Sequence, residues 1–258
     1  MSIHPTAIIE DGAVLGSNPS VGPYSHIGSN VVLGDDCDIK SHVVVDGHTK
    51  IGDRAAIFPF ACVGAIPQDK KYDGEKTFLE IGDDIVIREH VTVQPGTSSG
   101  GGVTRIGNSV LLMVGSHVAH DCLLGNNIIL VNNSMLGGHV VVEDFAIVGG
   151  LSGVHQFVRI GQHAMIGGMS GVDKDVLPFS MIAGERASLK GLNLIGLKRR
   201  KFNRDQISEL RDALDVLSKG DGLLSENLEK IRSELSDKGA LDELLRFIEN
   251  SGNRGLTL

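Results

Sequence analysis

Apolar residues recur along this chain at every sixth position. From Ile3 to Val63 each sixth residue is Ile, Leu or Val, and the same phase resumes at Ile81. After a one-residue slip the period continues from Ile106 to Val172, so that 26 positions share these three residue types. Because the three types make up only about a quarter of an ordinary chain, the regularity predicts a repeat architecture rather than a conventional globular core.

The other positions of the hexad agree with a short strand followed by a corner. The residue after the apolar one is Gly in 13 of the 26 repeats, which indicates either unusual backbone dihedrals or a close backbone approach. The fifth position is often small, as at Ala7, Ala13, Ser25, Cys37, Thr49, Ala55, Ser116, Cys122, Ser134 and Ala146. Three hexads then close a triangular coil, and the coils stack about 4.8 Å apart in a parallel β-helix. The period leaves the handedness open, although parallel crossovers are generally right-handed.

Two segments, near 64–80 and 95–105, interrupt the hexads. Loops on a regular solenoid often carry function or assembly, and a tolerated surface insertion is the alternative. The first segment contains Asp69, Lys71 and Tyr72, whose polar groups suit a substrate.

A different pattern follows the hexads. From about Gly191 apolar residues take helical spacing, and Asn203 with Gln206 forms a capping pair at the start of the longest helix. We therefore predict a β-helix domain over 1–190 and a C-terminal α-helical domain over 191–258 that caps the solenoid.

The composition favours a narrow aliphatic interior. Of 258 residues, 34 are Gly, none is Trp and only 4% are aromatic, although 41% are hydrophobic. A net charge of −8 argues against a nucleic-acid partner, because phosphate binding needs a basic face. There is no apolar stretch of about 18 residues and no signal-peptide pattern, so we expect a cytoplasmic protein without a membrane span. Of the free thiols Cys37, Cys62 and Cys122, the first and last occupy small positions and are expected to be inward fillers.

Four histidines fall at one edge of the predicted coil. Val118, Leu136 and Val154 are 18 residues apart and stack on one wall. Close to them in the sequence lie His117, His120, His139 and His155. The alternative is that these are surface histidines without a function, which stack only because the sequence repeats.

The neighbours of His120 suggest acid–base chemistry. Asp121 follows it directly and can orient it as a general base, and a backbone N–H at Gly137 or Gly138 can stabilise an oxyanion. Because no Ser or Cys nucleophile motif is present, direct attack by a substrate group is favoured over a covalent intermediate. A zinc site made by His117, His120 and His139 is the alternative that spacing leaves open.

A basic run stands out in this acidic chain. It contains Lys198, Arg199, Arg200 and Lys201, with Arg204 nearby. Such a cluster can bind a phosphate or an acidic protein, although a solvated helix face is the ordinary interpretation.

Several segments together resemble the UDP-N-acetylglucosamine O-acyltransferase family. They are the hexads, SHVAHDC around His120, NNSMLGGH ending at His139, GGLSGVHQF with His155 and Gln156, the QDKKYDGE loop and NLIGLKRRKF. The resemblance spans nearly the whole chain. It implies a left-handed parallel β-helix with a C-terminal helical domain, assembled as a homotrimer with active sites between subunits.

The resemblance also implies an activity. An (R)-3-hydroxyacyl group would move from acyl carrier protein to the 3-position of UDP-N-acetylglucosamine, in the first step of lipid A biosynthesis. No cofactor or metal of the enzyme's own is implied, since the acyl group is carried on the phosphopantetheine of the carrier protein. The basic run would suit that acidic partner.

Roles for individual residues follow from the same resemblance. His120 would be the general base, Asp121 would orient it, and the Gly138 N–H would stabilise the oxyanion. The residues implied for the nucleotide-sugar site are Asp69, Lys71, His117, His139, His155, Gln156, Asn193 and Arg199. Gly168, followed by Met169, falls where the family sets acyl-chain length, and Gly leaves room for a longer chain.

The chain departs from the family pattern at three positions. Ile195 stands where a Glu is common, Arg186 where a His is common, and Gln94 lies in VQPG where IHRG is usual. These positions bear on nucleotide contacts and on the acceptor, since some members acylate a 3-amino sugar nucleotide. The rivals are the related N-acyltransferase, which carries a domain before its hexads whereas here they begin at Ile3, a zinc β-helical carbonic anhydrase, and a non-catalytic scaffold.

Overall fold

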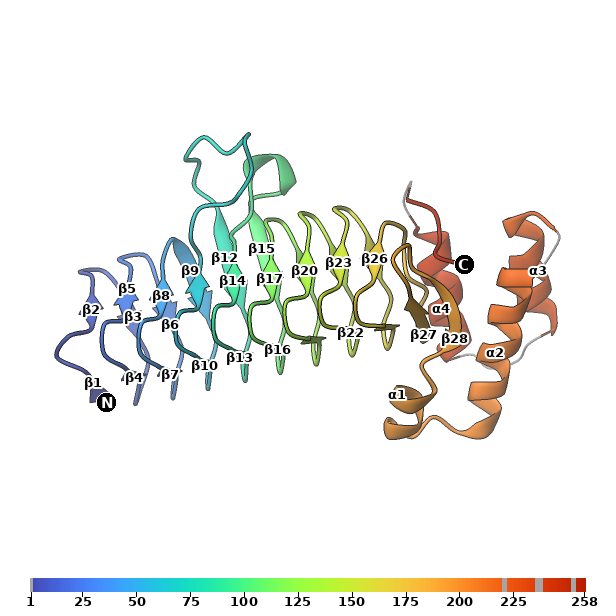
Figure 1. Ribbon diagram of the computed structural model, residues 1–258, viewed down its shortest axis with the longest axis horizontal. Coiled ribbons are helices and arrows are strands. Elements are labelled where there is room, and N and C mark those ends of the chain that lie inside the picture. The colour runs from blue at the N-terminus through green and yellow to red at the C-terminus, as the bar shows by residue number, and fades with distance from the viewer. Residues whose placement is uncertain (1, 220–221, 235–238, 252–253) are drawn as a thin grey trace.

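The computed structural model describes residues 2–219, 222–234, 239–251 and 254–258. It is a rod of stacked coils that ends in a group of helices, with the N-terminus at the far end of the rod (Figure 1). The walls of the rod are three sheets of very short strands, and all but one of the strand pairings are parallel.

Except for the last two, the strands are assigned to the three sheets in strict rotation. The first sheet contains β1 (Ser2–Ile3), β4 (Ser20–Val21), β7 (Asp38–Ile39), β10 (Ala56–Ile57), β13 (Val86–Ile87), β16 (Leu111–Leu112), β19 (Ile129–Leu130), β22 (Ile147–Val148), β25 (Met165–Ile166), β27 (Ser180–Ala183) and β28 (Ser188–Leu192). The second sheet contains β2 (Ile8–Ile9), β5 (His26–Ile27), β8 (Val44–Val45), β11 (Cys62–Val63), β14 (Thr92–Val93), β17 (His117–Val118), β20 (Met135–Leu136), β23 (Gly153–Val154) and β26 (Gly171–Val172). The third sheet contains β3 (Val14–Leu15), β6 (Val32–Leu33), β9 (His48–Ile51), β12 (Phe78–Ile81), β15 (Val103–Ile106), β18 (Leu123–Leu124), β21 (Val141–Val142) and β24 (Arg159–Ile160).

The register of the sheets confirms the hexad prediction. Ser2 pairs with Ser20, 18 residues further on. The spacing changes where the two interruptions lie, as between Ala56 and Val86, and at the last parallel pairing, where Met165 pairs with Met181. The apolar hexad residue ends its strand and points inward, so the core of the rod is a column of fully buried Ile, Leu and Val. Ile3 is 37% exposed because it belongs to the first coil.

All but one of the corner glycines serve close approach rather than unusual dihedrals. A Cβ on Gly34 would lie 2.6 Å from the carbonyl carbon of Gly52 in the next coil, and no left-handed φ occurs at Gly34. The left-handed residue of the corner comes two positions later and is usually not glycine, as at Asp36 (φ 54°) and Phe60 (φ 66°). Of the two meanings the sequence left open for these glycines, the dihedral one is therefore wrong for all of them except Gly64 (φ 83°).

Aromatic rings are excluded from the coil interior but gather on its corners. Tyr24, His42, Phe60 and His90 occupy successive corners between the first and second sheets, and each ring centroid lies 5.2 Å from the next. Small residues do fill the interior as predicted. Cys122 is fully buried, and burial raises the pKa of its thiol to about 12.

Helices follow the last coil. The antiparallel strand β28 returns from β27, and after it come α1 (Leu194–Arg199), α2 (Arg204–Lys219), α3 (Leu224–Glu234) and α4 (Ala240–Glu249). The predicted capping pair is confirmed, since the Asn203 N–H donates to Gln206 Oε1 (3.0 Å) and the Gln206 N–H donates to Asn203 Oδ1 (2.9 Å). The helices have a hydrophobic cluster of their own. Within the described residues, none of them is long and apolar enough to cross a bilayer.

Candidate active site

A groove of about 620 Å³ runs along the outer face of the second sheet. It is lined by Gln68, Gln94, His117, Ala119, His120, Met135, Leu136, Gly137, Gly138, Gly153, Val154, His155, Gly171, Val172, Asp173, Glu185 and Arg186. Three of the four predicted histidines line it. At β23 and β26 the outward residues are Gly153 and Gly171, so no side chain fills the groove there. The coil arithmetic therefore identified one continuous surface.

His120 and Asp121 form a hydrogen-bonded pair at this groove. His120 Nδ1 lies 2.8 Å from Asp121 Oδ2, and the Asp121 side chain is completely buried whereas His120 is 13% exposed. Asp121 occupies the left-handed corner position (φ 60°), which turns its side chain back behind His120. Because an ionised carboxylate can only accept, Nδ1 carries the proton and Nε2 is left as the free basic nitrogen on the groove side.

Gly138 lies against the other edge of the His120 ring. A Cβ at this position would be 2.5 Å from Cε1 and 2.7 Å from Nε2 of His120, so only glycine fits without moving the imidazole. Among the described residues no acceptor takes the Gly138 N–H, although the neighbouring Gly137 N–H donates to Val154 O. A free N–H beside a basic nitrogen is the arrangement needed to stabilise an oxyanion formed next to that base.

Two further histidines, His139 and His117, lie close to the pair, and their burial favours the neutral form. Burial lowers the pKa of His139, whose ring stacks on Phe157 at 4.3 Å and meets His120 edge-on at 5.1 Å. Burial also lowers the pKa of His117, whose Nδ1 lies 2.7 Å from Thr92 Oγ1. Neutral neighbours oppose protonation of His120 far less than charged ones would.

The residues able to hold a metal ion differ from those predicted. Ligand atoms of His120, Asp121 and His139 lie within 4.8 Å of one another, whereas His117 is not part of this group. The Asp121 carboxylate already accepts hydrogen bonds from the Thr97 N–H (2.8 Å), Thr97 Oγ1 (2.7 Å) and His120 Nδ1 (2.8 Å). These donors stabilise its charge without a cation, which favours the general-base interpretation.

Comparison with known proteins supplies the family. A family model for UDP-N-acetylglucosamine O-acyltransferase, domain 2, matches residues 175–257, and one for the bacterial transferase hexapeptide matches 12–47. A curated relative from Rhizobium johnstonii, named acyl-[acyl-carrier-protein]–UDP-N-acetylglucosamine O-acyltransferase, is 44% identical over 99% of this chain and 94% of its own length. This chain belongs to the UDP-N-acetylglucosamine O-acyltransferase family.

Other relatives agree. A protein of the same name from Campylobacter concisus is 41% identical over 100% of this chain and 97% of its own. The crystal structure of UDP-N-acetylglucosamine O-acyltransferase from Moraxella catarrhalis superposes with a TM-score of 0.95 at 40% identity, covering 100% of both chains. The acyltransferase described here is thus a left-handed parallel β-helix with a C-terminal helical region, and the handedness is the exception that the resemblance implied.

The loop residues of the predicted site lie near the pair. Asp69 and Lys71 are held together, since the Lys71 N–H donates to Asp69 Oδ1 (3.0 Å), and their charges reach His139, where Asp69 raises the pKa and Lys71 lowers it. Gln156 is exposed next to His155, whose Nδ1 lies 3.2 Å from the Gln156 carbonyl oxygen. This side of the acyltransferase therefore brings together most of the residues that the sequence selected.

Four predicted residues of this acyltransferase lie in the last coil and at α1, outside the groove lining of their own chain. Asn193 is buried at the start of α1, where Oδ1 accepts from the Gly196 N–H (3.1 Å) and Nδ2 donates to the His163 carbonyl (2.9 Å). Arg199 is exposed on the same helix. Gly168 and Met169 lie at the corner between β25 and β26, and Met169 is 72% exposed. Their roles stay predictions.

Residues that the sequence did not select also contribute to the site. Gln68 and Gln94 line the groove together, and the Gln68 N–H donates to Gln94 Oε1 (3.1 Å). From the sequence, Gln94 and Arg186 stand out only as departures from the family pattern. Thr97 had no sequence signal, because its contact with Asp121 spans 24 residues and crosses an irregular segment.

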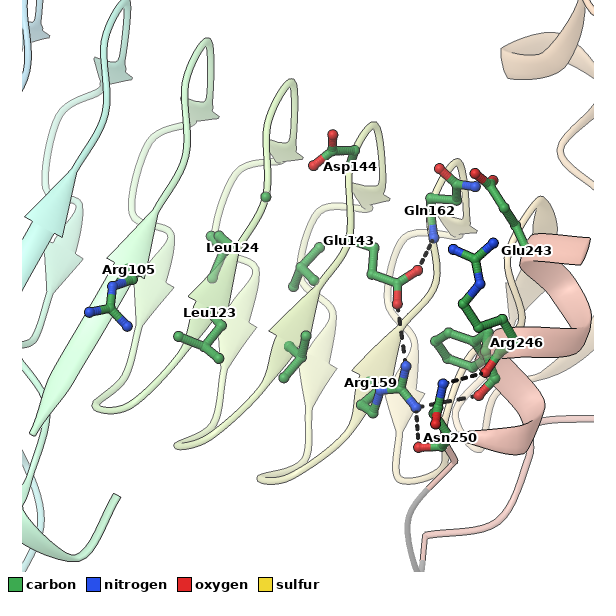
Figure 2. A pocket seen from close by; sticks show the side chains of 14 residues that line it. Arg105, Leu123, Leu124, Glu143, Asp144, Arg159, Gln162, Glu243, Arg246 and Asn250 are labelled. Atoms are coloured by element: carbon green, nitrogen blue, oxygen red, sulfur yellow. Dashed lines mark hydrogen bonds and ion pairs between the residues drawn. The ribbon is translucent and has the colours of Figure 1, made fainter. Parts of the chain in front are cut away.

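A second groove, of about 630 Å³, lies between the third sheet and α4, and the described residues that line it include no histidine. Figure 2 shows Arg159 reaching from the sheet toward the end of this helix. Arg159 pairs with Glu143 (3.3 Å), donates to the Asn250 carbonyl (2.6 Å) and lies over the Phe247 ring at 4.3 Å. These contacts of Arg159 attach the helical region of the acyltransferase to the rod.

Proposed function

We propose that this acyltransferase moves an (R)-3-hydroxyacyl group from acyl carrier protein to the 3-hydroxyl of UDP-N-acetylglucosamine, the first step of lipid A biosynthesis. The observation that carries the proposal is the His120 Nε2, backed by buried Asp121 and adjacent to the Gly138 N–H, neither of which has a hydrogen-bond partner among the residues that the structure describes. Full-length relatives named for this reaction support the identity of donor and acceptor.

The proposed reaction needs one base and one oxyanion donor. His120 Nε2 takes the proton of the sugar hydroxyl while the hydroxyl oxygen attacks the thioester carbonyl carbon. The negative charge that develops on the carbonyl oxygen is stabilised by the Gly138 N–H, and Asp121 stabilises the imidazolium. The C–S bond then breaks, the thiolate takes the proton from His120, and the ester product leaves. No covalent enzyme intermediate is required.

The active unit is a homotrimer with sites between subunits. The positions of Asn193 and Arg199, away from the groove of their own chain, support this arrangement, because a neighbouring chain would have to supply them. A row of exposed apolar side chains on the corners between the first and second sheets also supports it: Tyr24 (64%), Phe60 (54%), Leu151 (63%) and Met169 (72%). Such a row is typical of a surface that assembly covers.

The remaining parts of the proposal concern partners and place. The enzyme has no cofactor of its own, because the phosphopantetheine of acyl carrier protein carries the substrate. Its partners are that acidic protein and the UDP-sugar, not nucleic acid, and its place is the cytoplasm. Gly168 and Met169 border the acyl chain and set its length.

Mass spectrometry of the products tests the reaction. The purified protein is given a panel of 3-hydroxyacyl carrier-protein thioesters with UDP-N-acetylglucosamine or its 3-amino analogue. The proposal expects an ester on the first sugar and one preferred chain length. A faster reaction to an amide would reassign the acceptor, and equal rates at all lengths would remove the role of Gly168. Stoichiometric zinc together with carbon dioxide hydration would support the carbonic anhydrase instead.

Mixed assemblies test the shared site. His120→Ala and Arg199→Ala chains are each expected to be nearly inactive, but their co-assembly places an intact His120 opposite an intact Arg199 in about a quarter of sites. Partial recovery of activity on mixing is therefore expected. The double variant, mixed with itself, is the matched control, and no recovery in the heterologous mixture would refute a site between subunits.

A further inference from the structure

The second interruption of the hexads encloses the carboxylate of the catalytic pair. Thr97, which is 1% exposed, donates its backbone N–H to Asp121 Oδ1 (2.8 Å) and its hydroxyl to Oδ2 (2.7 Å). Oδ2 is also the oxygen that meets His120 Nδ1. One residue from a distant loop thus holds both oxygens of the group that orients the base.

We propose that Thr97 is a positioning residue, which fixes the Asp121 carboxylate so that His120 is held in its catalytic tautomer and orientation. The proposal rests on the proposed function of His120 as general base. With Asp121 completely buried, only these donors and His120 Nδ1 hydrogen-bond to its oxygens among the described residues, and His139 Nε2 lies farther off, 3.8 Å from Oδ2. Two bonds from one residue prevent the carboxylate from rotating, whereas the bond to His120 alone would not.

The packing of the loop supports this role. A Cβ on Gly100 would lie 2.0 Å from Asp121 Cγ, so the loop backbone lies directly against the carboxylate. Farther along, Thr104 Oγ1 accepts from the Asp121 N–H (2.8 Å). Thr92 and its partner His117 are 25 positions apart instead of 18, and the longer segment between them supplies Thr97, Gly100 and Thr104, all of which contact Asp121.

The loop itself is held by the first interruption. Glu75 Oε1 accepts from the Ser98 N–H (3.0 Å) and Oε2 accepts from the Asp73 N–H (2.8 Å). These bonds, that of Ser98 first, lower the pKa of Glu75 to about 2, so it is ionised at neutral pH. Figure 1 shows the two loops protruding from the same side of the rod, next to each other. The hydrogen bond from Ser98 to Glu75 therefore links the segment that contains Asp69 and Lys71 to the segment whose Thr97 contacts Asp121.

Three substitutions at Thr97 test the role. Thr97→Val keeps the shape and the N–H but removes the hydroxyl donor, and kcat is expected to fall about tenfold or more with KM nearly unchanged. Thr97→Ser restores the donor and is expected to recover most of kcat. If the valine variant does not assemble, Thr97→Ala removes the same donor without placing a methyl group against the carboxylate.

A matched control comes from Thr49. It is equally buried at 1% exposure, and its hydroxyl donates to the Asp46 carbonyl (2.6 Å), far from the pair. Thr49→Val is expected to lower the melting temperature but not kcat. If Thr97→Val also kept wild-type kcat, the proposal would be wrong.

A double-mutant cycle with Asp121→Asn separates positioning from general stability. If Thr97 acts through Asp121, Thr97→Val lowers kcat by a much smaller factor in the Asp121→Asn background than in the wild type. Equal fold-losses in both backgrounds would show a merely structural role. Failure of the proposed function is a different result, because His120→Ala would then keep full activity whatever Thr97 does.

Discussion

Two stacks of rings on the corners of the rod invite comparison. The catalytic stack consists of His120, His139 and Phe157, and the docking stack consists of Phe145, His163, Phe179 and Phe202. In each, a histidine in the left-handed corner position stacks on a phenylalanine, at 4.3 Å for His139 and 4.8 Å for His163.

The environments of the two histidines differ. His139 lies beside Asp121 at the edge of an open groove, 20% exposed. His163 is 7% exposed because Phe202 and the chain after α1 cover it, and its Nδ1 has no hydrogen-bond partner in the described part of the chain. Burial, with Arg200 nearby, lowers the pKa of His163 to about 4. The repeat supplies a ring at each corner, and the irregular segment placed over it decides between chemistry and packing.

The largest difference is expected when one ring is removed from each stack. His120→Ala should lower kcat/KM by about three orders of magnitude, because the general base is lost. His163→Phe keeps a stacked ring and should change kcat/KM by less than about threefold. Steady-state rates of acyl transfer measure both. A large loss in His163→Phe with an intact fold would end the distinction between the stacks.

A smaller effect should come from the glycines beside the catalytic stack. Gly138→Ala places a methyl group against the His120 ring and should lower kcat about a hundredfold. Gly153→Ala is the matched control, since Gly153 lines the same groove but a Cβ there meets nothing within 4 Å. Comparable losses in the two variants would show that groove volume, not the His120 contact, matters.

The smallest effect concerns acid stability and the docking stack. Unfolded His163 takes up a proton below about pH 6.5 whereas the folded residue, with its pKa of about 4, stays neutral, so stability is complete above pH 6.5 and declines as the pH falls toward 4. The loss at pH 4.5 should be about 2 to 3 kcal/mol per chain. Chemical unfolding at pH 7 and 4.5 measures it, and His163→Phe should flatten the dependence. An unchanged slope in that variant would assign the acid sensitivity elsewhere.

Sequence reasoning was most successful where the structure is periodic. The hexads predicted the strands, the buried face and the stacking of positions 18 apart, and this stacking brought His117, His120 and His155 to one groove. The pairing of His120 with Asp121 was predictable because the two are adjacent. The meaning of the corner glycines was not, since close approach and left-handed dihedrals select the same residue.

The periodic pattern by itself determined the coil, its aliphatic interior and the edge on which the histidines lie, because residues 18 positions apart return to the same wall after three hexads. Only the tertiary structure decided what covers each corner. Thr97 reaches Asp121, and the segment after α1 reaches His163, through irregular segments whose paths no period encodes. The burial and hydrogen bonding of each histidine depend on those paths. For this reason His139 lies beside the candidate catalytic pair at an open groove, whereas His163 packs between the rod and the segment after α1.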